Sequence, residues 1–186
     1  MGIALTLPRA LEADAARVEE AGLFQALARI NIEGPAGPEF ELRLPGGQVW
    51  RVRREALPEA KSLLPGRYVD TARVWASVTP IALDRHPKAV GDAEASIAAA
   101  CERIGLPEPL RVVASKHSAI RGAPSARPNA VAPEWTGWRL PASLTGRRLT
   151  HAVVEFNAPV SGPILLGAGR FVGLGLCLPL REAASE

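Results

Sequence analysis

The order of strand-forming and helix-forming segments constrains the fold of this chain more than any other feature. From residue 70 onward, a β-rich segment precedes a helical segment, and further β-rich segments follow it. The segments lie at 73–83, 91–106, 109–120, 150–160, 161–171 and 173–180, with a long insert of Pro, Gly, Arg and Trp at 121–148. Because 161–171 has the length of a short turn or helix, the order is βαββαβ. It predicts an α+β domain of the ferredoxin-like type over residues 70–186.

The helix at 91–106 has the clearest pattern in the sequence. Ile97, Cys101 and Ile104 recur at helical spacing and predict its buried stripe. Asp92 is placed to be the N-cap, and Gly105 is placed to end the helix.

Residues 1–69 carry other elements. Residues 9–30 predict an amphipathic helix with a break at Gly22, and 39–54 predict a β-hairpin that turns at 45–47, Pro-Gly-Gly. Residues 55–70 have the composition of a proline-interrupted connector. We expect this part to be a second, partial ferredoxin-like subdomain, with the helix and the hairpin as its last elements.

Composition narrows the class of protein. Hydrophobic residues make up 47% of the 186 positions, which is enough to bury a core. No run of eighteen or more apolar residues occurs and the first residues lack a signal-peptide pattern, so we expect a cytoplasmic protein without a membrane partner. Cys101 and Cys177 stand in apolar surroundings and are expected to be buried free thiols.

Positive charge is concentrated in the second half of the chain. The net charge is only +3, yet residues 111–181 hold nine basic and two acidic side chains. All but three of the 22 basic residues are arginine, which suits bidentate phosphate contacts. The excess favours a polyanionic ligand, although arginine richness also accompanies GC-rich genomes.

Three histidines are the candidates for proton transfer. His86 follows a strand between Arg85 and Lys88, and these cations favour a neutral ring that serves as a general base near pH 7. It is equally interpretable as a turn residue. His117 ends the second strand beside a lysine, and His151 opens the third strand, where a structural role is favoured.

Other chemistries find little support in the sequence. The histidines lack metal-type spacing, so no metal site is expected. No G-x-S-x-G motif occurs, and the segment GAGRFVG departs from the dinucleotide-binding pattern, so neither a serine hydrolase nor a nucleotide cofactor is expected. Trp135 and Trp138 are either stacking platforms for unpaired bases or core residues of a long loop.

A glycine-rich stretch near the end of the chain is the most distinctive local feature. LLGAGRFVGLGLCLPL, at 165–180, holds four glycines in an apolar run. Glycine weakens a strand, so these positions indicate a close approach to the backbone. Two explanations stay open, the sugar-phosphate chain of RNA and tight packing of the last elements.

Four segments together resemble one family. They are WASVTPIALDRHPK, ACERIGLPEP, RGAPSA and VEFNAPVSGPILLGAGRFVGLGLCLPL. A glycine-rich loop before the last strand of a ferredoxin-like domain resembles the mark of the RAMP superfamily of CRISPR proteins. More specifically, the segments resemble the C-terminal half of the type I-G (earlier I-U) fusion of a Cascade backbone subunit with the CRISPR repeat endonuclease. The likeness covers residues 70–181 well and 1–69 loosely, and the front half of the family proteins has no counterpart here.

The resemblance implies a metal-independent endoribonuclease that matures CRISPR RNA. It implies no cofactor, repeat RNA as the ligand, and other type I-G Cascade subunits as partners. In relatives the catalytic histidine often lies just after the first strand of a subdomain, and His86 has that place here. In those relatives, however, the histidine belongs to the first of two subdomains, whereas His86 belongs to the second. We therefore rank His86 first, His117 second and His151 third, with Lys88 as a neighbouring cation. The expected RNA-binding residues are Arg85, Lys116, Arg121, Arg147, Arg148, Gly167, Gly169, Arg170, Gly173 and Gly175.

Two alternatives to an endoribonuclease belong to other classes of protein. One is a catalytically silent Cascade subunit that grips the repeat handle through arginines. The other is a ferredoxin-like scaffold that only holds other subunits together, its basic face on acidic partner surfaces.

Overall fold

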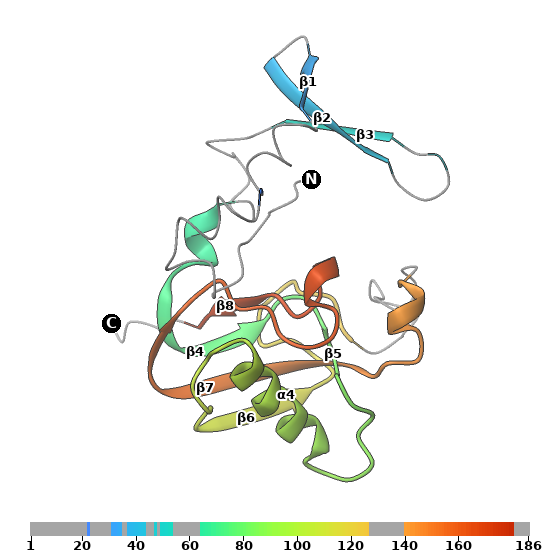
Figure 1. The fold of residues 1–186 in the computed structure, drawn as a ribbon. Helices are drawn as coiled ribbons and strands as arrows, with labels where there is room; N and C mark the ends of the chain where they lie inside the picture. Colours follow the sequence, from blue (N-terminus) through green and yellow to red (C-terminus); the bar gives the residue numbers. More distant parts are fainter. Residues whose placement is uncertain are drawn as a thin grey trace. The chain divides into compact units, whose positions relative to one another are not determined.

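The computed structural model describes residues 22, 31–34, 37–43, 47, 49–53, 64–126 and 140–180. The chain divides into two compact units, Met1–Leu64 and Pro65–Glu186 (Figure 1). The sequence placed the boundary after residue 69. The difference arises because the short 3-10 turn Pro65–Arg67 belongs to the second unit.

The first unit contains a three-stranded antiparallel sheet. Its strands are β1 (Asn31–Gly34), β2 (Gly37–Arg43) and β3 (Val49–Arg53), in that order across the sheet. The expected hairpin is confirmed, since Arg43 pairs with Val49, and a cross-strand ion pair joins Glu41 to Arg51 at 3.5 Å. The expected helix at 9–30 lies outside the described residues except for Gly22, whose φ of 63° suits the predicted break.

The second unit is an α+β fold with an antiparallel sheet and, within its described residues, one α-helix. The elements are β4 (Thr71–Ser77), β5 (Ile81–Ala82), α4 (Asp92–Arg103), β6 (Arg111–Ser115), β7 (Leu149–Ser161) and β8 (Cys177–Pro179). The long strand β7 is central: β6 pairs along one of its edges, β5 and β4 follow one another along the other, and β8 pairs with β4. Figure 1 shows α4 lying across this sheet.

The single strand expected at 73–83 is wrong in one respect, because the chain leaves the sheet after Ser77 and returns at Ile81. In the gap, the backbone N–H groups of Val78 and Thr79 turn to the carbonyl of Leu176, at 2.7 and 3.4 Å. The Thr79 hydroxyl also donates to the Gly173 carbonyl at 2.9 Å. The glycine-rich stretch therefore takes the place of a strand neighbour here.

Helix α4 matches its prediction at the C-terminus and differs at the N-terminus. Gly105, at φ 79°, and Leu106 donate to the carbonyls of Glu102 and Cys101, the two bonds of a Schellman motif. The N-cap, however, is Gly91 at φ 91°. Asp92 is the first helical residue, and its carboxylate turns back to the preceding loop.

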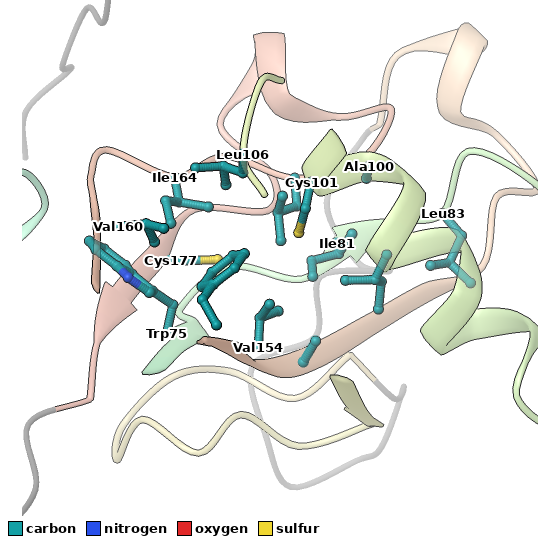
Figure 2. Close-up of a cluster of buried hydrophobic side chains, with 14 residues drawn as sticks. Trp75, Ile81, Leu83, Ala100, Cys101, Leu106, Val154, Val160, Ile164 and Cys177 are labelled. Carbon is teal, nitrogen blue, oxygen red and sulfur yellow. The ribbon is translucent and has the colours of Figure 1, made fainter. Parts of the chain in front are cut away.

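The main core lies between α4 and the sheet, and Figure 2 shows its side chains. Trp75, Phe156 and Ile97 are fully buried there. Cys101 on α4 and Cys177 on β8 are buried free cysteines in the same cluster, which confirms the expected thiols. Burial raises the pKa of Cys101 to about 12 and also raises the pKa of Cys177, so both thiols are protonated at neutral pH.

Candidate functional site

A hollow of about 310 Å³ opens at the end of the β5–β7 pairing. One wall is the segment after β5, and the other is the turn before β7. The lining residues are Leu83, Arg85, His86, Ser143, Thr145, Gly146, Arg147 and Arg148. Two pairs of residues that the sequence singled out, Arg85 with His86 and Arg147 with Arg148, thus line one hollow although more than sixty positions separate the pairs along the chain.

The register of β5 on β7 brings the two walls together. Ala82 pairs with Leu149, and the next residue, Leu83, donates its N–H to the carbonyl of Arg148 at 3.0 Å. The pairing therefore continues one step into the hollow. It places the segment that carries His86 directly beside the one that carries Arg148.

Arg147 joins the same two walls through its side chain. One guanidinium nitrogen, Nη1, donates to the carbonyls of Leu83 at 3.0 Å and Asp84 at 2.6 Å. Its Nε donates to the carbonyl of Ser143 at 3.4 Å. Three donor contacts of this one residue are thus committed to the protein backbone.

The loop that carries His86 is fixed at both ends by carboxylates. At its start, Asp84 forms an ion pair with Arg103 of α4. At its end, Asp92 accepts the N–H groups of Lys88 and Ala89 at 2.7 and 2.8 Å. These two hydrogen bonds lower the pKa of Asp92, Ala89 first and Lys88 second, so the anionic acceptor persists into mildly acidic solution.

The cations that remain available in the hollow are Arg85 and Arg148. Both side chains are exposed, and among the described residues neither has a hydrogen-bond or ion-pair partner. They come from opposite walls with exposed His86 on the first of them. Two guanidinium groups beside an imidazole can bind a phosphodiester and transfer a proton at it.

His151 has a different environment and is only 1% exposed. Its Nε2 lies 2.9 Å from the carbonyl of Pro124, which can only accept, so Nε2 carries the proton. Nδ1 then accepts from the Ser77 hydroxyl at 2.9 Å and also lies 3.2 Å from the Ser77 carbonyl, and that hydroxyl accepts the Ala152 N–H. Desolvation lowers the pKa of the ring, which keeps it neutral. With both nitrogens committed inside the protein, His151 ties the start of the insert to the sheet.

The other candidate cations do not line the hollow. His117 is exposed and lies close enough to His151 to lower the pKa of that ring further. Lys116 donates its Nζ to the Leu149 carbonyl at 2.5 Å, a contact within the fold. Lys88 lies at the far end of the loop beside Asp92, and Arg121 is exposed on the turn after β6.

The glycine-rich loop approaches its own chain closely. A Cβ on Gly167 would stand 2.4 Å from the Ala82 carbonyl oxygen, and one on Gly175 would stand 2.0 Å from the Leu166 carbonyl oxygen. On Gly169 it would meet the Leu174 side chain at 2.7 Å, whereas Gly173 faces open space. At three of the four positions, glycine is required by packing within the domain, which is one of the two explanations that the sequence left open.

The glycine-rich loop packs against the elements from which the walls of the hollow emerge. Leu174 packs in a second apolar cluster with Ala82, Leu144 and Leu149, which belong to β5, to the short turn before the hollow and to β7. In addition, Ala168 donates its N–H to the Ala82 carbonyl at 2.9 Å. The loop thus fixes the strand ends from which both walls of the hollow emerge.

Arg170 stands apart from the hollow on the short 3-10 turn Arg170–Val172. Its Nη1 donates to the Gly167 carbonyl at 3.2 Å, and its guanidinium lies 4.4 Å from the centre of the Phe171 ring. Phe171 is 82% exposed. Sequence reasoning named Arg170 and missed Phe171, because nothing in an apolar run marks one member as exposed.

The hollow also contains residues that the sequence did not indicate. Ser143, Thr145 and Gly146 lie in an insert without periodic pattern, and only their nearness to the arginines could have drawn attention to them. Trp135 and Trp138, proposed as stacking platforms, lie outside the described residues.

Searches for related proteins returned nothing: no family model, no curated protein and no solved structure matches this chain. Among the residues that the structure places, no helix is both long and apolar enough to cross a membrane. Within that same part of the chain, no group of three or more His, Cys, Asp or Glu side chains could hold a metal ion.

Proposed function

We propose that this chain binds RNA in the hollow around His86 and cleaves it there, as a CRISPR repeat endoribonuclease of type I antiviral defence. The observation that carries the proposal is the convergence of exposed His86 with Arg85 and Arg148 in one hollow. Of the three histidines, His86 alone is both exposed and among the residues that line it. The family resemblance adds the repeat RNA and the Cascade partners to this proposal.

The proposed chemistry is attack of a ribose 2′-OH on the adjacent phosphate. Neutral His86 removes the proton of the 2′-OH as the new O2′–P bond forms and the P–O5′ bond breaks. The products are a 2′,3′-cyclic phosphate and a 5′-oxygen, which takes a proton from the protonated imidazole or from water. Arg85 and Arg148 bind the phosphate oxygens, on which charge builds up during the reaction.

The sheet order supports a ferredoxin-like topology for the second unit. In chain order its four principal strands are β4, β6, β7 and β8, and across the sheet they stand as β6, β7, β4 and β8. The third strand thus lies between the second and the first, with the fourth beside the first, as that topology requires. In place of its second helix, the glycine-rich loop carries the turn Arg170–Val172. We extend the proposal to the first unit, whose three strands would be the remainder of a second such subdomain.

The test compares His86→Ala with His117→Ala in cleavage of CRISPR repeat RNA in EDTA. We expect His86→Ala to lower the single-turnover rate by a factor of about 100 or more, as the loss of a general base does, with the Kd for RNA within about threefold. His117→Ala should cut at the wild-type rate, because His117 does not line the hollow. A substrate with a 2′-deoxyribose at the cut should bind and stay intact.

Two results would decide against this mechanism. Unchanged cleavage by His86→Ala would remove His86 from the reaction. Tight, salt-sensitive binding without any product from the wild-type protein would instead identify a subunit that holds the repeat handle.

A further inference from the structure

Arg147 differs from the other arginines of the hollow in what its guanidinium contacts. Nη1 contacts the carbonyls of Leu83 and Asp84 on one wall, and Nε contacts the carbonyl of Ser143 on the other. Arg85 and Arg148 have no such partners among the described residues. Among the described residues, one arginine of the hollow is therefore engaged by the protein, and the other two have no such partner.

The groups that Arg147 contacts lie directly before His86 in the chain. Leu83 and Asp84 immediately precede Arg85 and His86, and their carbonyls lie at the point where the chain leaves β5. The same chain segment is also held by the Leu83 N–H, which donates to the carbonyl of Arg148, the residue after Arg147. Beyond Leu83 the loop is mostly exposed, and among the described residues the hydrogen bonds of Arg147 are the last ones between the two walls before His86.

We infer that Arg147 is a positioning residue: it ties the two walls of the hollow together and sets the place of His86 relative to Arg148, and it does not itself bind the RNA phosphate. A planar guanidinium can serve carbonyls on two walls at once, which a lysine ammonium on its flexible stem cannot do in the same geometry. The hydrogen bonds by which Arg147 joins the two walls, called the tie below, are a feature of the fold alone. Their effect on cleavage rests on the proposed function.

The experiment pairs Arg147→Lys with Arg148→Lys, since both variants keep the charge of the wild-type protein. The first readout needs no RNA: hydrogen exchange of the Leu83 amide, followed by NMR. Loss of the tie in Arg147→Lys should speed this exchange by about tenfold, as expected when one or two charge-assisted hydrogen bonds are lost. In Arg148→Lys the Leu83 exchange should stay within about twofold of the wild type, because its bond to the backbone of residue 148 remains.

The second readout separates binding from turnover on repeat RNA. Arg147→Lys should lower the rate at saturating RNA by about tenfold with Kd within about threefold, because a misplaced base slows the chemical step. Arg148→Lys should instead raise Kd, because the bidentate phosphate contact is lost. Melting temperatures of both variants should be compared first, so that a global loss of fold is recognised.

The outcomes distinguish the inference from the function. Wild-type Leu83 exchange in Arg147→Lys would overturn the tie, whatever the RNA does. Faster exchange in a protein that neither binds nor cuts RNA would support the tie and contradict the proposed function. A raised Kd with unchanged exchange and rate in Arg147→Lys would return Arg147 to the ligands of the phosphate.

Discussion

His151 carries two hydrogen bonds on a ring that is almost completely buried. Nε2 donates to the Pro124 carbonyl and Nδ1 accepts from Ser77, an arrangement that uses the neutral ring fully. Burial is the main reason that its pKa is lowered; it outweighs the Pro124 and Ser77 carbonyls, which raise the pKa, and nearby His117 adds to the lowering. A histidine that folds into such a place makes stability depend on pH.

The direction of this pH dependence follows from comparing the pKa of His151 in the folded and unfolded protein. In the unfolded chain, His151 has an ordinary pKa of about 6.5 and takes up a proton below that pH. The folded protein resists this proton, so its stability is complete above pH 6.5 and falls as the solution is acidified below it. Urea unfolding at pH 7.5 and 5.5 measures the loss. His151→Gln should lose this part of the pH dependence and His86→Gln, at an exposed position, should keep it; an equal loss in all three proteins would contradict the assignment.

At the scale of elements, substitutions in the glycine-rich loop test whether packing within the domain requires its glycines. Gly175 has φ 73° and a backbone oxygen 2.0 Å from where its Cβ would stand, whereas Gly173 has φ 81° and open space. Gly173→Ala should therefore lower the free energy of unfolding by only about 1–2 kcal/mol, the cost of the left-handed conformation. Gly175→Ala should cost more than about 3 kcal/mol, because the Leu166 backbone must also move.

Chemical denaturation of both variants provides the comparison. Equal losses at the two positions would contradict the packing explanation. If Gly173→Ala instead weakened RNA binding strongly while the fold stayed intact, the exposed part of the loop would belong to the RNA interface.

Elements with local causes were predictable from the sequence, and those with distant causes were not. The buried stripe of α4 and its Gly105 terminus follow from spacing and from glycine conformation, and both are confirmed. The break of the first strand after Ser77 depends on Leu176, about a hundred residues later, and local pattern does not predict it. Asp92 was assigned as N-cap on residue type alone, whereas its carboxylate bonds to Lys88 and Ala89 behind it.

In the candidate site, too, features with local causes were predictable from the sequence and features with distant causes were not. Arg85 and His86 were placed correctly after a strand, since strand and turn signals are local. That Arg147 lines the same hollow follows from the register of Ala82 on Leu149, which no local pattern states. The engagement of the Arg147 guanidinium with backbone carbonyls is likewise visible only in the folded chain.

At the scale of the whole molecule, the apolar clusters of the described structure all belong to the second unit. The larger cluster draws on β4, α4, β7, β8 and the glycine-rich stretch, and the smaller one joins Ala82 of β5 and Leu149 of β7 to Leu174 of the glycine-rich loop. The hollow lies within that unit as well. A compact unit with its own core has what independent folding requires.

We therefore expect residues 65–186, produced alone, to unfold in one cooperative transition, with a Tm within about 5 °C of that of the same unit in the full chain. Near-ultraviolet circular dichroism during heating follows the packing around Trp75, which is fully buried in this core. The Leu83 amide should exchange in the fragment at the same rate as in the full chain, because its acceptor and the Arg147 contacts all lie after residue 65. A fragment that binds a hydrophobic dye and melts without a transition would show that the core needs residues 1–64. Since the described residues that line the hollow and those of the glycine-rich loop all lie within the fragment, we expect the folded fragment to bind RNA and the unfolded fragment to lose this binding.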